Sequence, residues 1–246
     1  MPGGGPHPKD GELFAAPRLP ALRRAAAELR FLRERGYALP SAIKLVGDRH
    51  QLRERQRVAI SRATSEAAGA AERGMRRLGA GQPPPGALWV DGFNVVITVE
   101  TALRGGVLVT TADGGLRDLA GVHGSYRVSE VTGEALARVA AVLVGRGWRA
   151  TPARWYLDAP VSNTGRLGAR IREVGRAEGL RWEAEVVPDP DAVLIQAPAA
   201  TTVATGDAAI LDRCGPWVDL GSEVVRATVP DAWVVDLVPA EPGSEA

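Results

Sequence analysis

Leu88-Trp89-Val90 runs directly into Asp91-Gly92-Phe93-Asn94, and this stretch decides the fold. A short apolar run that meets an Asp-Gly turn is typical of a buried strand that ends there. Two later apolar runs also end in aspartate, Trp155–Asp158 and Thr202–Asp207. The ends of three such strands are expected to carry the chemistry of the chain, because ligands of parallel sheets bind at the carboxyl ends of strands.

The sequence on both sides of these runs alternates between strand and helix patterns. Seven segments are expected to be strands: Ala87–Val90, Val107–Thr110, Arg154–Leu157, Arg181–Val187, Thr201–Ala204, Trp217–Leu220 and Trp233–Leu237. Five segments have helical patterns: Asn94–Leu103, Ser129–Gly145, Asn163–Glu178, Asp207–Arg213 and Ser222–Thr228. This alternation predicts an α/β fold with a Rossmann-like, doubly wound, mainly parallel sheet that is covered on both faces.

The part of the chain before the sheet has a different character, and we expect five regions in all. They are a disordered N-terminus (1–17), a small basic α-helical region (18–78), a Gly/Pro-rich linker (79–86), the α/β domain (87–238) and a disordered tail (239–246). The helical region is expected to hold three helices, over about 20–35, from about 41, and from about 51 to 78.

Charge is divided unevenly between these regions. Residues 1–80 carry 16 Lys/Arg and 8 Asp/Glu, whereas the rest of the chain is acidic, so that the formal net charge is only +1. Arginine binds phosphates in a bidentate manner, and Arg53 and Arg57 are therefore expected to contact the backbone of a nucleic acid. Two alternatives stay open: the basic helices could face solvent with their own acids paired to them, or dock on the acidic domain.

Composition limits the compartment and the kind of site. A single cysteine, Cys214, excludes an internal disulfide and a cysteine-based zinc site. No apolar run approaches the roughly 18 residues that span a bilayer, and the start of the chain lacks a signal-peptide pattern. A cytoplasmic protein with no membrane contact is expected, and a homo-oligomer is an open alternative to a monomer.

The three aspartates at the strand ends, Asp91, Asp158 and Asp207, are the predicted catalytic residues. Carboxylates gathered at one edge of a sheet repel one another unless a cation or a proton neutralises them, and hard oxygen ligands favour Mg²⁺ or Mn²⁺. Asp113, which follows the run Val107–Thr110, is a fourth candidate metal ligand or a turn residue. The alternative for each aspartate is that it caps the following helix.

Further residues are expected around this site. Asn94 could hydrogen-bond Asp91 or a substrate phosphate, or could cap the helix that follows. The helix start at Ser162, Asn163 and Thr164 could bind a substrate phosphate, or one of these residues could be only the cap. A second group is expected to surround the metal ligands without binding the metal: Asp118, Asp212 and His123. Asp189 and Asp191, on either side of Pro190, are expected to lie in a loop.

The phrase Val90-Asp91-Gly92-Phe93-Asn94, followed later by Ala204-Thr205-Gly206-Asp207, resembles the acidic motifs of the PIN-like nucleases, particularly their NYN branch. The resemblance covers roughly residues 87–220. It implies a Rossmann-like sheet, an Mg²⁺ or Mn²⁺ site at Asp91 and Asp207, with Asp158 as the intervening acid, and hydrolysis of RNA or single-stranded nucleic acid. Many members carry that intervening acid on or near a helix. Residues 20–65 resemble the helical region of an uncharacterised prokaryotic family.

Other functions remain open. A metal-dependent phosphatase that acts on a small phosphate ester could use the same carboxylates, although the haloacid-dehalogenase mechanism would need an acid where Phe93 stands. A non-catalytic module that binds nucleic acid or protein is a second alternative. A nucleotide-cofactor oxidoreductase is disfavoured because the turn at Asp91 has no GxGxxG phosphate loop.

Overall fold

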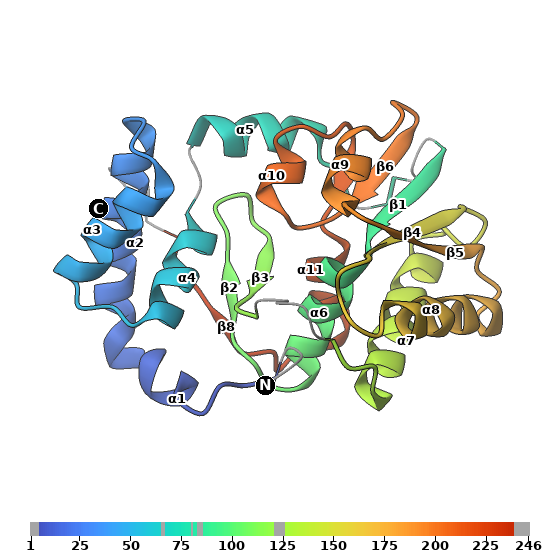
Figure 1. The fold of residues 1–246 in the computed structure, drawn as a ribbon, viewed down its shortest axis with the longest axis horizontal. Coiled ribbons are helices and arrows are strands. Elements are labelled where there is room, and N and C mark those ends of the chain that lie inside the picture. Colours follow the sequence, from blue (N-terminus) through green and yellow to red (C-terminus); the bar gives the residue numbers. More distant parts are fainter. Residues whose placement is uncertain (1–4, 65–66, 80, 83–85, 121–125, 239–246) are drawn as a thin grey trace.

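The computed structural model describes residues 5–64, 67–79, 81–82, 86–120 and 126–238 (Figure 1). The tail predicted after Val238 and much of the predicted 79–86 linker lie outside these residues. Within the described part of the chain, no helix combines the length and the apolar character that crossing a bilayer requires.

A five-stranded parallel sheet forms one half of the molecule. Its strands are β1 (Ala87–Asp91), β4 (Ala153–Asp158), β5 (Trp182–Val187), β6 (Thr201–Ala204) and β7 (Trp217–Val218). They lie in the order β5-β4-β1-β6-β7. The chain thus builds outward from β1 in one direction, returns, and continues from β6 in the other. This is the strand order of Rossmann-like folds, and its switch point lies between β1 and β6.

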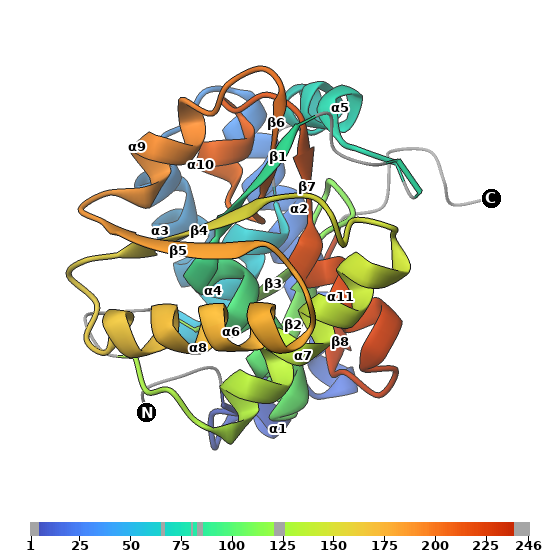
Figure 2. The same cartoon turned by 90° about the vertical axis from the view of Figure 1, so that its right-hand side faces the viewer.

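Helices cover both faces of this sheet, as predicted. They are α6 (Gly92–Leu103), α7 (Glu130–Gly145), α8 (Thr164–Ala177), α9 (Pro190–Ile195), α10 (Ala208–Leu211) and α11 (Leu220–Thr228). Side chains along a strand alternate between faces. Leu88 and Val90 accordingly pack in the core with α6, α7, α8 and α11, while Trp89 packs on the opposite side with α9 and α10 (Figure 2).

Two of the predicted strands do not join this sheet. A second, three-stranded sheet has the order β3-β2-β8, with β2 at Leu108–Thr110, β3 at Leu116–Asp118 and β8 at Val234–Val235. The segments predicted at Val107–Thr110 and Trp233–Leu237 form this sheet instead. Its apolar side chains, Val109 and Val235 among them, need a cover of their own, and the N-terminal helices provide it.

The N-terminal helices are α2 (Leu19–Glu34), α3 (Leu39–Arg49), α4 (Glu54–Ala63) and α5 (Ala67–Arg76). The predicted long helix over 51–78 is interrupted, because Thr64 takes an extended conformation (ψ 133°) at the end of α4. Helices α2, α3 and α4 share one core with the second sheet. Helix α5 reaches across to the parallel sheet, where the indole of Trp217 donates a hydrogen bond to the carbonyl of Arg73 (2.8 Å).

The segment before α2, predicted to be disordered, also has structure. It contains α1 (Asp10–Leu13) and a 3₁₀ turn (Ala16–Arg18), and both Leu13 and Phe14 are buried. The disorder prediction rested on the Gly/Pro content of the segment. The burial of these apolar side chains and an ion pair between Asp10 and Arg55 outweigh that composition.

The ion pair of Asp10 is expected to contribute strongly to stability. Asp10 is 1% exposed, and Arg55 Nη2 donates to its Oδ2 at 2.8 Å. Arg55→Met should lower the free energy of unfolding by about 3 kcal/mol, because it leaves a buried carboxylate without its partner. Urea denaturation measures this loss, with Arg53→Met, an exposed arginine at the start of the same helix, as the control. Equal midpoints for both variants would show that the pair contributes nothing.

Candidate functional site

Asp91 ends β1 and begins α6, at the switch point of the sheet. Its Oδ2 accepts a hydrogen bond from Thr205 Oγ1 (2.7 Å), and its Oδ1 accepts one from the backbone N–H of Asn94 (3.4 Å). The helix starts at once because Gly92 has no side chain: a Cβ there would collide with Leu157 and lie 3.0 Å from the Tyr156 carbonyl oxygen. The Asp-Gly sequence therefore places a buried carboxylate at the carboxyl ends of the strands.

The surroundings of Asp91 destabilise its negative charge. Burial is the main cause, and the carboxylates of Asp207 and Asp191 add to it, so that the pKa of Asp91 rises from 3.8 to about 7 despite the hydrogen bond from Thr205. Such a shift marks a candidate site when it arises from burial together with neighbouring charges in a cleft between strands.

The loop after β6 forms the other side of the switch point. The side-chain oxygen of Asn94 accepts from the N–H of Gly206 (2.8 Å), which ties the two loops together. Thr205 Oγ1 also accepts from the N–H of Asp207 (3.0 Å). Asp207 itself is exposed and caps α10 by accepting from the N–H of Ala209 (2.7 Å). Asp91 and Asp207 thus both act as helix caps, as the alternative prediction held, and the Asp207 carboxylate also lies close enough to Asp91 to raise its pKa.

Asp191 is the residue that the sequence reasoning missed. It lies in the first turn of α9, a helix that contacts β1 and β4 on its way from β5 to β6. Partial burial raises the pKa of Asp191, and the carboxylates of Asp207, Asp189 and Asp158 raise it further. Asp189, not Asp191, caps this helix. Among the described residues, no hydrogen bond or ion pair is recorded for the Asp191 carboxylate.

The signal for this helix is present in the sequence. Asp189-Pro190-Asp191 combines a capping residue, a proline at the first helical position and an acid in the first turn, which is a helix start. The proline between the two acids made the segment resemble a loop.

Asp158 ends β4, as predicted, but lies at the margin of the acidic cluster, which consists of Asp91, Asp191 and Asp207. It is half-buried, and its pKa is raised by burial and then by the charge of Asp189. Neither Asp91 nor Asp207 is among the charges that affect it. Asp191 occupies the central position that the sequence reasoning gave to Asp158.

Asp91, Asp158, Asp191 and Asp207 offer carboxylate oxygens, which are suitable ligands for a hard divalent cation. Within the described residues, no arginine or lysine lies within ion-pair distance of these four carboxylates. Their present placement is not that of a shared ligand set, since the described part of the chain contains no group of three Asp, Glu, His or Cys that could hold a metal ion. Asp91, Asp191 and Asp207 are the residues that would hold one.

The other predicted acids are bound to arginines instead. Asp113 faces both Arg73 (3.3 Å) and Arg117 (3.8 Å) and accepts from Thr111 Oγ1. Burial raises its pKa, but the charges of the two arginines and the bond from Thr111 leave the pKa below its usual value. Asp118 pairs with Arg62 and Asp212 with Arg73. These acids hold the N-terminal helices against the sheets, which assigns Asp113 a structural role in place of metal binding.

The predicted phosphate-binding helix start has structural contacts of its own. Ser162 Oγ accepts from the N–H of Tyr126, and Asn163 Nδ2 donates to the Tyr126 carbonyl (2.7 Å). Thr164 Oγ1 donates to the carbonyls of Asp158 and Val161. These bonds join two loops. Of the residues predicted to bind a substrate phosphate beside the acids, Asn94 is the one that lies at the switch point. His123 lies outside the described residues.

The two arginines predicted to bind nucleic acid lie away from the acids. Arg53 is exposed at the start of α4. Arg57 donates to the carboxylate of Asp48 (2.8 Å) and to the Leu52 carbonyl (3.0 Å), so it packs the helices together. Other arginines of α4 and α5 contact the α/β part: Arg55, Arg62, Arg73 and Arg76. Docking of the basic region on the acidic domain, one of the open alternatives, is therefore observed.

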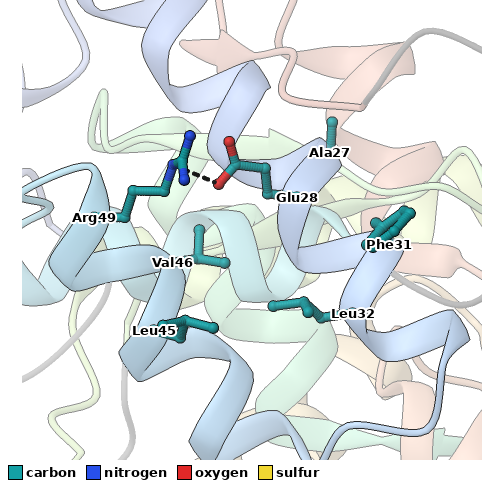
Figure 3. Close-up of a pocket in the computed structure, with 7 residues that line it drawn as sticks. All are labelled: Ala27, Glu28, Phe31, Leu32, Leu45, Val46 and Arg49. Atoms are coloured by element: carbon teal, nitrogen blue, oxygen red, sulfur yellow. Dashed lines mark ion pairs between the residues drawn. The ribbon is translucent and has the colours of Figure 1, made fainter.

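An apolar pocket of about 560 Å³ lies between α2 and α3 (Figure 3). Phe31 and Leu45 line it and are 52% and 60% exposed. Its charged residues, Glu28 and Arg49, form an ion pair with each other (3.4 Å). The pocket therefore offers an apolar surface without free charges, and it lies away from the carboxylates.

Comparison with known proteins divides the chain in two. A family model described as "Domain of unknown function (DUF5616)" matches residues 85–223, and one described as "Protein of unknown function (DUF434)" matches residues 21–76. A protein of Methanocaldococcus jannaschii named "Uncharacterized protein MJ0935" is similar at 28% identity over 210 residues, which cover 84% of this chain and 97% of that protein. No solved structure matches.

Proposed function

We propose that this chain, which belongs to the DUF5616 family, is a hydrolase of phosphodiester bonds that depends on Mg²⁺ or Mn²⁺ and acts on single-stranded nucleic acid, most readily RNA. In this proposal the α/β part is a PIN-like domain. One observation carries it: the buried Asp91 carboxylate lies at the switch point of a Rossmann-like sheet, where the carboxylates of Asp207, from the β6–α10 loop, and Asp191, from α9, lie close enough to raise its pKa.

The arrangement has features that hydrolysis of a phosphodiester needs. A bound Mg²⁺ or Mn²⁺ would supply a water of lowered pKa and neutralise charge that develops on the phosphate oxygens. Thr205 and the N–H of Asn94 fix the orientation of the Asp91 carboxylate. The bond between Asn94 and Gly206 keeps the β1 and β6 loops together, so that Asp91 and Asp207 stay on the two sides of one crevice.

Asp191 distinguishes this proposal from a purely structural role for the acids. Asp91 and Asp207 cap helices, and a capping function alone would explain their positions. Asp191 caps nothing, and it affects the charge of Asp91 from a different helix. A carboxylate held beside two others without an ion-pair partner costs free energy, which a cation would offset.

Asp191→Asn is expected to lower the rate of Mn²⁺-dependent hydrolysis of a fluorescent single-stranded RNA by about 100-fold, a loss typical of a residue that stabilises developing charge. The matched control is Asp231→Asn, an exposed aspartate beyond α11, which should keep the wild-type rate. A wild-type rate in Asp191→Asn would remove this residue from the site. A parallel assay with p-nitrophenyl phosphate separates the nuclease from the phosphatase.

A further inference from the structure

A second pocket, of about 370 Å³, adjoins the acidic cluster. Its lining includes Arg62 of α4, Arg73 of α5 and Arg117 of β3, together with Asn94 and Asp207. It is thus built from both the 21–76 and the 85–223 segments. Asp207 belongs to the pocket and to the acidic cluster at once.

Arg73 is the residue that points to a ligand. It is 3% exposed, its Nη1 donates to Asp212, and its Nε lies 3.3 Å from Asp113. Its Nη2 is buried and has no hydrogen-bond partner in the described part of the chain. Buried donors are rarely left unpaired, and a guanidinium N–H at a pocket wall is suited to an oxoanion.

The other two arginines of the lining are held in place by hydrogen bonds from their guanidinium groups. Arg117 donates to Asp219 Oδ2 (2.6 Å), and Arg62 donates to the carbonyl of Ala120 (2.9 Å). Gly206 keeps the space open, because a Cβ there would lie 2.6 Å from Arg117 Nη1. Three arginines line the pocket together with two aspartates, Asp113 and Asp207, while the other acids that pair with these arginines, Asp118, Asp212 and Asp219, do not line it.

We infer that this pocket binds a phosphate group of the nucleic-acid strand, next to the phosphodiester that the acidic cluster hydrolyses. The inference rests on the proposed function for the identity of the substrate and on the pocket itself for the binding of phosphate. It gives the N-terminal helices a part in substrate binding through Arg62 and Arg73, in place of Arg53 and Arg57.

The test is isothermal titration of the full chain with inorganic phosphate in EDTA, where no hydrolysis takes place. Ala208 is exposed, begins α10 and lines the pocket, so Ala208→Glu places a negative charge there without touching an arginine. The wild type should bind phosphate saturably, and Ala208→Glu should weaken binding by about tenfold or more. Ala208→Gln, of similar size and uncharged, should stay within about twofold.

A second pair of variants tests the arginines. Arg62→Gln should weaken phosphate binding by about tenfold, whereas Arg57→Gln, in the same helix but outside the lining of the pocket, should not. Circular dichroism melting confirms that each variant is folded. Absence of saturable binding to the wild type, or equal affinity in Ala208→Glu, overturns the inference even if Mn²⁺-dependent hydrolysis is found. Binding with no hydrolysis of any strand supports the oxoanion pocket and rejects the nuclease.

Discussion

Asp91→Asn is expected to reduce Mn²⁺-dependent hydrolysis of single-stranded RNA by about 1,000-fold or more while stabilising the folded chain at pH 8. The loss of activity follows because the amide removes a negative charge from the centre of the proposed cation site. Asparagine caps a helix as well as aspartate does and can still accept the bond from Thr205, so the local fold should persist. Activity assays and urea denaturation of the same preparation measure both effects.

The stability effect has a definite pH dependence. The pKa of Asp91 is about 7 in the folded chain and 3.8 in its unperturbed state. Its protonated form is stable in the fold, so this group lowers the free energy of unfolding as the pH rises from about 4 to about 7. Wild type and Asp91→Asn should therefore be similar at about pH 4 or below, and the variant should be more stable by about 4 kcal/mol at pH 8.

Asp189→Asn is the control for this result, because Asp189 caps α9 by the same kind of bond to Ala192. Asp189 is exposed, so its replacement tests the loss of a capping carboxylate alone and should not give the gain in stability at pH 8. If Asp91→Asn retains its activity and has the stability of the wild type at both pH values, then Asp91 acts only as a helix cap.

Removal of residues 1–78 is expected to prevent the remaining chain from folding. Val107, Val109, Val235 and Leu237 are each at most 3% exposed and pack against the N-terminal helices. Exposure of four such side chains costs about 1.5–3 kcal/mol each, which is comparable to the whole stability of a typical domain. Trp217 would also lose its bond to the Arg73 carbonyl. Size-exclusion chromatography and thermal melting of residues 79–246 measure the outcome.

A monomeric fragment 79–246 that melts cooperatively near the temperature of the full chain would contradict this expectation. It would mean that the two segments matched by different family models are independent domains. The structure instead has α5 joined to β7 through the bond from Trp217 to the Arg73 carbonyl, and α4 packed against the second sheet (Figure 1).

The sequence predicted the features of this molecule that depend on local patterns. The apolar run Leu88–Val90 and the Asp-Gly turn that follows it identified β1 and its end, because apolar runs and turn chemistry act over a few residues. The same holds for Asp158 and Asp207, which both stand where predicted. Which acid lies centrally depends on strand order, and Asp191 reaches the centre only because α9 crosses back over β4 and β1.

Long-range pairing was beyond local patterns as well. Asp113 and Asp212 looked like free acids near the site, yet both bind Arg73, which lies far from them in the sequence. The charge asymmetry between the two halves indicated attraction but could not say whether nucleic acid or the acidic half was the partner. The second sheet was missed for a related reason: Val107–Thr110 has the pattern of a buried strand, and that pattern does not state which sheet it joins.

The account depends most on a divalent cation shared by carboxylates at the switch point. An anomalous difference map from a crystal of the full chain soaked in MnCl₂ tests this directly. The account predicts a single strong peak in contact with Asp91 and with Asp207, Asp191 or both. A map with no peak at these residues, or with Mn²⁺ bound only elsewhere, would contradict it.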